Sequence, residues 1–180
     1  MIPNLVTQRL EIRLQADIDP KALLAYYIRN KAFHAPWSPL RPQTFYQAKE
    51  IERSVKKGHA GFKFCLLSEG KPIGLVTVSG IECGALMGGY LGFSLDEAAQ
   101  GKGLMFEALS ALIPHIFTKP ICGQEPLHRL MAAHMPDNTR SAALLARLGF
   151  QREGFAKAYL RIAGQWEDHV LTSLINPGSN

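Results

Sequence analysis

The sequence predicts one α+β domain over residues 1–180, with about seven strands and about four helices. The first observation behind this is the order of hydrophobic patterns, which gives a strand, two helices, three strands, a helix, a strand, a helix and two strands. The second is the composition of the 180 residues, 47% hydrophobic and 19% charged, which is enough apolar surface for one core. No repeat or low-complexity tract interrupts these patterns.

Short-range residue patterns predict the secondary structure of residues 5–42. Residues 5–14 form a strand, because apolar and charged side chains alternate along most of it. A helix begins at Asp19 and Pro20, a capping residue followed by a proline in the first turn, and runs to about Asn30. Residues 33–42 contain three prolines, too many for regular structure. Trp37 in this segment either lies in the floor of a binding cleft or fills the core beneath the loop, and the second alternative is the more common one.

The remaining elements follow in order and share clear turn or cap signals. A helix at 44–57 ends at Gly58, and a hairpin turns at Glu69-Gly70 between strands 62–67 and 71–79. Residues 84–89 are a loop and 120–126 a linker. Pro114 should kink the helix at 104–117 or end it early. The other expected elements are strand 90–95, strand 128–135, helix 139–148 closed by Gly149, and strands 150–161 and 165–174 turning at Ala163-Gly164.

Charge and cysteine content narrow the class of protein. The net charge of +5 favours an anionic ligand or partner, but the basic residues form no run, so direct recognition of nucleic acid is not expected. Cys65, Cys83 and Cys122 are odd in number and lack Cys-x-x-Cys spacing, which argues against disulfides and zinc and for a reducing compartment. No apolar run reaches the roughly 18 residues of a membrane span. We therefore expect a cytoplasmic protein with no membrane partner.

A glycine-rich turn at residues 100–105 lies between a strand and a helix, where free N–H groups and close backbone approach suit a phosphate. A Walker loop is excluded because Lys102 is followed by Gly103 and not by Ser or Thr. A dinucleotide fingerprint needs a third glycine and a βαβ unit with an acidic residue further on, and neither is clear in this sequence. The Gln/Arg-x-x-Gly-x-Gly/Ala signature of acetyl-CoA-dependent N-acetyltransferases matches at Gln100 and Gly103 and departs at Met105. An ordinary glycine turn is about as common an explanation of six such residues.

Five longer segments carry a resemblance to a known family: residues 90–94, 100–109, 135–141, 144–150 and 164–171. Together with the element order, they resemble the GNAT acetyltransferases, specifically the RimJ/RimL group and within it the RimJ branch. Met105 is common in that group at the sixth position of the turn. Arg9-Leu10 and Pro36-Trp37 also fall where the branch has similar residues, so the resemblance covers nearly the whole chain.

The resemblance implies a single GNAT domain with a mixed central sheet, acetyl-CoA as donor and no metal. It implies acetylation of the N-terminal alanine of a small-subunit ribosomal protein, with that protein and the ribosome as partners and a monomeric or homodimeric state. The same chemistry on a small-molecule amine is the nearest alternative. A ribosome-associated binding protein with little catalysis is a different class, which the basic charge and the missing base would favour.

The resemblance also assigns site residues. The CoA pyrophosphate would bind the backbone of Gln100, Gly101, Lys102, Gly103, Leu104 and Met105, and the pantetheine arm would pair with Phe93, Ser94 and Leu95. One backbone N–H of that strand would polarise the acetyl carbonyl. Asn138 would contact the pantetheine and Ser141 would donate to the departing thiolate, although capping of the helix at 139–148 would explain both residues without catalysis. Trp37, Tyr90 and His134 would contact the acceptor.

The general base is not assigned by the resemblance. Tyr90 stands where many GNAT enzymes have a glutamate, and Leu160 stands where RimL-type relatives have an acid. Relay through water leaves four candidates: His134, Glu153, Asp168 and His169. Tyr159 is a weaker alternative to Ser141. A peptide α-amine with a pKa of about 7.7–8.0 is already roughly 10–15% neutral at pH 7, whereas a lysine is almost wholly charged, so a weak base suits an N-terminal amine.

Overall fold

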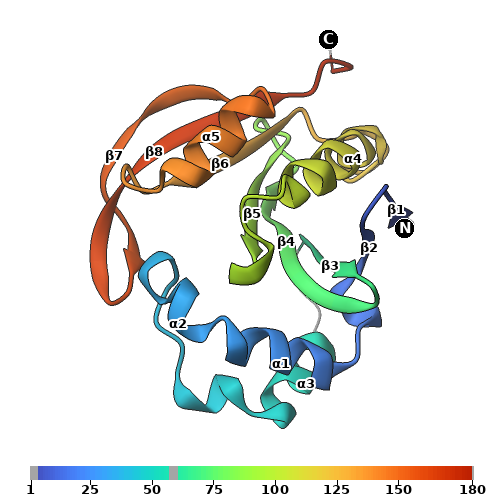
Figure 1. Ribbon diagram of the computed structural model, residues 1–180. Coiled ribbons are helices and arrows are strands. Elements are labelled where there is room, and N and C mark those ends of the chain that lie inside the picture. The colour runs from blue at the N-terminus through green and yellow to red at the C-terminus, as the bar shows by residue number, and fades with distance from the viewer. Residues whose placement is uncertain (1–3, 57–60, 180) are drawn as a thin grey trace.

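The computed structural model of the chain describes residues 4–56 and 61–179 (Figure 1). Within them, eight strands form one sheet in the order β1-β2-β3-β4-β5-β6-β8-β7. Only β5 and β6 pair in parallel in this described sheet, so the sheet is mixed. The strands are β1 Leu5–Val6, β2 Glu11–Leu14, β3 Gly61–Ser68, β4 Lys71–Glu82, β5 Gly88–Leu95, β6 Arg129–His134, β7 Gln151–Ile162 and β8 Gln165–Ile175.

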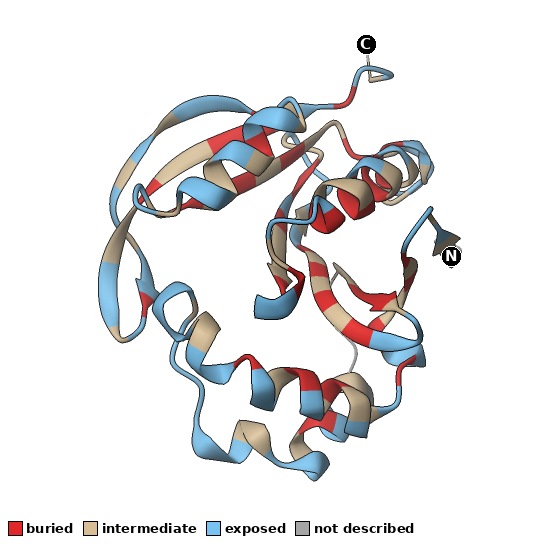
Figure 2. Cartoon of the chain, viewed as in Figure 1, coloured by how far each residue is buried: buried red, intermediate tan, exposed pale blue. Residues whose placement is uncertain are grey.

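Helices cover both faces of the sheet. The α-helices are α1 Pro20–Arg29, α2 Lys31–His34, α3 Ala48–Lys56, α4 Leu104–Thr118 and α5 Thr139–Arg147. Apolar residues of α4 and α5, such as Leu109 and Leu145, pack with Val76 and Leu91 of the sheet in the larger core. A second core joins α1 and α3 to the opposite face of β3. Figure 2 shows the buried residues along the central strands and α4, while the far part of the β7–β8 hairpin is mostly exposed.

The α+β class and the single-sheet arrangement are confirmed, with three differences in the first half of the chain. The expected strand at 5–14 is divided into β1 and β2, which raises the number of strands to eight. The expected helix at 44–57 is a 3-10 turn, Gln43–Tyr46, followed by α3, and its end at Gly58 lies outside the described residues. The proline-rich segment begins with α2 and a 3-10 turn, Ala35–Trp37, because Pro36 fits a first helical turn.

Of the two outcomes expected at Pro114, a kink or an early end of the helix, the early end is wrong. Helix α4 continues to Thr118. Pro114 and Ser110, whose carbonyl loses its partner, both lie on the exposed face, where water can satisfy that carbonyl. Leu112 and Ile116 on the buried face hold the helix on both sides of the proline.

The capping and turn predictions are confirmed. The Asp19 carboxylate accepts a hydrogen bond from the Lys21 N–H (2.9 Å), and α1 begins at Pro20. Gly149 ends the turn after α5 with φ of +90°. Glu69 and Gly70 have φ of +51° and +74° between β3 and β4, and Ala163 and Gly164 also have positive φ between β7 and β8. These hairpin turns therefore match the right-handed twist of their strands.

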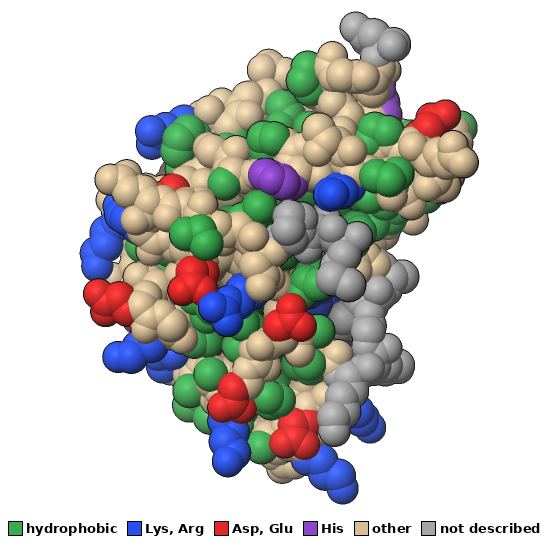
Figure 3. All heavy atoms as spheres, turned by 90° about the vertical axis from the view of Figure 1, so that its right-hand side faces the viewer, with side chains coloured by type: hydrophobic (Ala, Val, Ile, Leu, Met, Phe, Trp, Pro, Cys, Tyr) green, Lys and Arg blue, Asp and Glu red, His purple; other side chains and the backbone are tan. Residues whose placement is uncertain are grey.

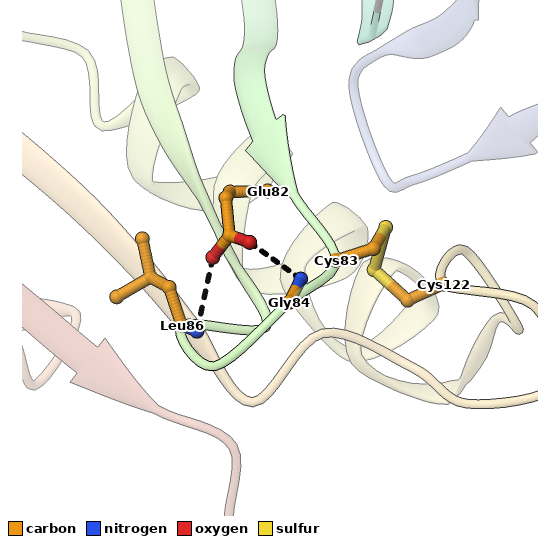
Figure 4. Close-up of a disulfide and its surroundings, with 5 residues drawn as sticks. All are labelled: Glu82, Cys83, Gly84, Leu86 and Cys122. Atoms are coloured by element: carbon orange, nitrogen blue, oxygen red, sulfur yellow. Dashed lines mark hydrogen bonds between the residues drawn. A yellow bond between two sulfur atoms is a disulfide. The ribbon is translucent and has the colours of Figure 1, made fainter.

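The prediction that the cysteines form no disulfide is wrong. Cys83, just after β4, is bonded to Cys122 in the linker after α4, and only Cys65 is free among the described cysteines. Figure 4 shows the disulfide beside the β4–β5 loop, where the Glu82 carboxylate accepts from the Gly84 and Leu86 N–H groups. An odd cysteine count cannot exclude a pair that only the folded chain brings together. The cysteine argument for a reducing compartment therefore fails.

Two surface observations bear on the expected partners. Among the described residues, none of the helices has the length and apolar character of a transmembrane segment. The face of the molecule seen in Figure 3 carries acidic and basic side chains interspersed, without a large patch of one sign.

Candidate active site

Strands β5 and β6 separate and leave an open strand edge. Their parallel pairing is confined to Gly88, Gly89 and Tyr90 of β5, and beyond that point the two strands diverge (Figure 1). The Asp96 N–H donates to the Ile73 carbonyl on the other side of β5 (2.7 Å). Backbone groups alternate between the two edges of a strand, so those of Phe93 and Leu95 face the gap. This edge can pair with an extended ligand.

The end of β5 is held by two side chains that converge on one carbonyl. His34 Nε2 (2.9 Å) and Gln100 Nε2 (3.1 Å) both donate to the Leu95 carbonyl. The side chain of Leu95 is buried in the larger core, and that of Phe93 packs against the same core. As expected, these two residues can offer a ligand mainly their backbone.

The glycine-rich turn presents unpaired N–H groups. Gly101 and Gly103 both have φ of +72°, which glycine adopts at no steric cost. Gly103 is also the N-cap of α4. In the described structure we find no acceptor for the N–H groups from Gly101 to Met105. Orphan donors at the positive end of a helix dipole form an anion site, so this turn fits a phosphate.

A cavity of about 570 Å³ occupies the gap between β5 and β6. It brings together nine of the predicted site residues, namely Trp37, Phe93, Ser94, Leu95, Gln100, Met105, His134, Asn138 and Ser141. Gly101, Lys102, Gly103 and Leu104 continue from Gln100 and do not line it, and neither does Tyr90. Trp37 is 41% exposed and lines the cavity, so the alternative in which it fills the core is wrong.

A second cavity of about 460 Å³ adjoins the first. The two share five lining residues, His34, Ser38, Gly92, Phe93 and Ser94. The described lining of the second cavity includes Lys31, Arg41 and Lys63 but no carboxylate. Burial lowers the pKa of Lys63, and the charge of Arg41 lowers it further. The two cavities meet at the open edge of β5, which suits a donor in one and an acceptor in the other.

Asn138 and Ser141 lie together at the start of α5. The Asn138 carbonyl Oδ1 accepts from the Ser141 N–H (3.1 Å), so the predicted cap is confirmed. The Asn138 Nδ2 group has no partner within the described chain and remains able to donate. Both side chains line the first cavity, which makes capping and ligand contact compatible.

Of the four candidate bases, only the two histidines line a cavity. The Glu153 carboxylate is paired with Arg129 and accepts from Ser173, and the Asp168 carboxylate accepts from the Ala158 N–H (2.8 Å). These contacts give both acids structural roles. His134 and His169 are buried and line the first cavity.

The ring nitrogens of these histidines have defined partners. Nδ1 of each ring lies near a carbonyl, that of Met135 (2.9 Å) for His134 and that of Glu167 (3.0 Å) for His169. A carbonyl only accepts, so Nδ1 donates and a neutral ring keeps Nε2 as acceptor.

Tyr159 and Tyr90 form a pair next to His169. The Tyr159 ring lies 5.7 Å from the His169 ring, measured between centroids. Burial raises the pKa of Tyr159, and its hydrogen bond with Tyr90 raises it further. Tyr90 is 44% exposed on this side of the sheet.

Sequence reasoning missed several lining residues. His34 and Ser38 line both cavities, and Asp137 is the only carboxylate in the described lining of the first. His34 belongs to the same proline-rich segment, residues 33–42, as Trp37. Its contact with Leu95, 61 positions away, leaves no local signal.

The open β5 edge, the glycine turn with free N–H groups and the cavity between β5 and β6 together fit an extended ligand that carries phosphate, as an acyl-CoA-dependent transferase requires. Residues 9–151 match the acetyltransferase (GNAT) domain family. The chain belongs to this family.

Three relatives are similar over most of their length. The chain is 44% identical to the [ribosomal protein uS5]-alanine N-acetyltransferase of Escherichia coli K12, covering 97% of this chain and 91% of the relative. The crystal structure of a ribosomal-protein-S5-alanine acetyltransferase from Vibrio fischeri superposes with a TM-score of 0.90 at 36% identity, covering 99% of each chain. RimJ of Mycobacterium smegmatis, solved in complex with a CoA disulfide, superposes with a TM-score of 0.81 at 25% identity, covering 92% of this chain and 81% of that one.

Proposed function

We propose that this protein transfers the acetyl group of acetyl-CoA to the N-terminal alanine of ribosomal protein uS5. The observation that carries the proposal is the 44% identity, across 97% of the chain, to an enzyme named for that reaction. The two adjoining cavities support it, because the chemistry needs a donor site and an acceptor site that meet at one backbone edge.

The donor would bind along the first cavity. The N–H groups from Gly101 to Met105 would hold the pyrophosphate, for which unpaired donors at a helix start are well suited. The pantetheine arm would pair with the open edge of β5 as an added strand, with Asn138 Nδ2 donating from the other wall. Met135 and Leu144 also line the cavity and would keep water from the thioester.

The reaction would need only a small contribution from any one side chain. The acceptor amine attacks the thioester carbonyl, and the N–H of Phe93 or Leu95 on the open edge stabilises the oxyanion. Ser141 donates a hydrogen bond to the leaving thiolate, whose conjugate thiol has a pKa of about 8.5. A neutral His134 or His169 accepts the amine proton at Nε2, directly or through water.

The acceptor would enter through the second cavity. Its lining includes residues of α1, α2 and the segment after them, with Arg41 over the Tyr27 and Phe45 rings. A neutral α-amine needs only a weak base, which fits a site where Glu153 and Asp168 have structural partners.

The test is mass spectrometry of ribosomal proteins and a panel of free amines after incubation with acetyl-CoA and the purified chain. A gain of one acetyl group on the N-terminal alanine of uS5 is expected. Acetylated free amines with unmodified ribosomal proteins would contradict the acceptor but keep the donor site. No product in spite of measured CoA binding would favour a binding protein.

A further inference from the structure

The segment before β2 contacts the glycine-rich turn although they are about a hundred positions apart in sequence. Arg9 Nη1 donates to the Lys102 carbonyl (2.9 Å), and Arg9 Nε donates to Glu107 Oε2 (2.7 Å). Glu107 Oε1 accepts from the Thr7 hydroxyl (2.6 Å) and from the Arg9 N–H (2.8 Å). One of these hydrogen bonds therefore connects the N-terminal segment to the turn, and the other three connect it to Glu107 in the first turn of α4.

The contact with Lys102 fixes the orientation of one peptide unit. The carbonyl of Lys102 and the N–H of Gly103 belong to the same planar trans peptide, so they point in opposite directions. When Arg9 holds the carbonyl on its own side, the Gly103 N–H points to the other side. A turn with two glycines has much conformational entropy to lose, so an external contact that selects one orientation prepares it for an anion.

The contact of Arg9 with Glu107 balances a negative charge close to the turn. Glu107 lies in the first turn of α4, where an unpaired carboxylate would repel a phosphate at the same helix start. Burial alone would raise the pKa of Glu107, but hydrogen bonds from Thr7 and Arg9 outweigh burial and lower it. The carboxylate therefore stays charged, and the Arg9 guanidinium balances it.

We propose that Arg9 is a positioning residue for donor binding, which orients the Gly103 N–H and neutralises Glu107. The inference rests on acetyl-CoA as donor. The Arg9 side chain is 46% exposed, and such a surface ion pair contributes little to folding. Variants at this position should therefore fold, and their effect should depend on whether the ligand carries phosphates.

The experiment compares equilibrium binding of CoA and of pantetheine, which lacks the pyrophosphate, in the wild type, Arg9→Gln and the control Arg13→Gln. Arg13 belongs to β2, pairs with Glu11 and does not contact the turn. For Arg9→Gln we expect the Kd of CoA to rise about tenfold, the size of one charge-assisted hydrogen bond, with the Kd of pantetheine unchanged. Arg13→Gln should leave both constants unchanged.

The variant Arg9→Lys distinguishes the two parts of the proposal, orientation of the Gly103 N–H and neutralisation of the Glu107 charge. Lysine keeps the charge but cannot donate to the Lys102 carbonyl and Glu107 in a fixed fork, so it should show most of the loss. Full recovery with lysine, or equal weakening of both ligands, would contradict the proposal. No change in Arg9→Gln would overturn it. A wild type that does not bind CoA would instead overturn the proposed donor, on which the inference depends.

Discussion

The proposed donor and acceptor sides of the site differ in the groups that would meet a ligand. On the donor side the ligand would meet main-chain groups, the open edge of β5 and the N–H groups of the glycine turn. On the acceptor side the described lining consists largely of side chains, including three cations and the rings of Tyr27 and Phe45. A cofactor common to a family can be bound by backbone, whereas the choice of acceptor needs side chains, which differ from protein to protein.

The two sides also differ in how they are held. The proposed donor side borders the larger core, to which its lining residues Leu91, Leu95 and Met105 belong. The acceptor side is bridged by the tip of the β7–β8 hairpin, where the Ala163 N–H donates to the Ser38 carbonyl (3.0 Å). Leu40 lies against Gly164, since a Cβ built there would be 3.0 Å from Leu40 Cδ1. Changes on the acceptor side should therefore alter peptide binding more than stability.

The largest expected effect is on stability, and it should leave both the donor side and the acceptor side of the site unchanged. Replacing Cys83 and Cys122 by serine opens a loop with a sequence separation of 39 residues. The free energy of unfolding should fall by about 3–4 kcal/mol on loop-entropy grounds. The KM values for acetyl-CoA and peptide should stay unchanged, because neither cysteine lines a cavity. Denaturant unfolding with and without reductant measures this, and reductant should not affect the double variant.

The donor side should be most sensitive at the backbone. Gly103→Val places a β-branched residue at φ of +72°, so the turn must change conformation and the N–H groups move. We expect kcat/KM for acetyl-CoA to fall about 100-fold, or ~2.7 kcal/mol. Gly70→Val is the matched control, since Gly70 has φ of +74° in the β3–β4 turn, away from both cavities. Equal loss of activity in both variants would show a general folding defect.

A side chain on the donor side should contribute less. Ser141→Ala removes the proposed donor to the thiolate but keeps its N–H in the helix cap. We expect kcat to fall about tenfold with KM for acetyl-CoA unchanged, which is the size of one hydrogen bond. Asn138→Ala, in contrast, should lower the unfolding free energy by about 1 kcal/mol through loss of the cap. Full activity of Ser141→Ala would remove Ser141 from the mechanism.

The acceptor side is probed by Leu40→Ser. Loss of the contact with Gly164 should loosen the hairpin tip and raise the KM for an alanine-starting peptide about threefold, or ~0.7 kcal/mol. The KM for acetyl-CoA should not change. Ile28→Ser removes another exposed apolar side chain, on α1, that lines neither cavity. Steady-state kinetics with each substrate varied in turn would distinguish the two sides, and a higher KM for acetyl-CoA alone would contradict the division.

The smallest expected effect is on the pH dependence of stability. Because the pKa of Glu107 is lowered in the folded state, its contribution to stability is present above the ordinary glutamate pKa of about 4.3. That contribution is lost as the pH falls through the lowered value. The stability advantage of the wild type over Glu107→Gln should be below about 1 kcal/mol at neutral pH and should vanish in acid. Unfolding midpoints across this range measure it, and an advantage that grows in acid would contradict the assignment.

Prediction from sequence succeeded where the signal was local. The cap at Asp19 and the turns at Glu69-Gly70 and Ala163-Gly164 depend on a few adjacent residues, and each was confirmed. The early helix end expected at Pro114 was wrong, because the cost of a proline within a helix depends on whether the freed carbonyl faces water. That is a property of packing. The disulfide was missed because spacing along the chain does not report distance in space.

Within the site, too, features that depend on adjacent residues could be predicted and contacts between distant segments could not. The glycine turn and the cap at Asn138 are readable because backbone conformation follows from residue type and short spacing. The contact of His34 with Leu95 and that of Arg9 with Lys102 join segments far apart in the chain. Sequence by itself determined the α+β class, the family and the glycine-rich turn before α4. Only the tertiary structure decided how β5 separates from β6, which residues line the two cavities and what holds the turn, because these depend on contacts between distant segments.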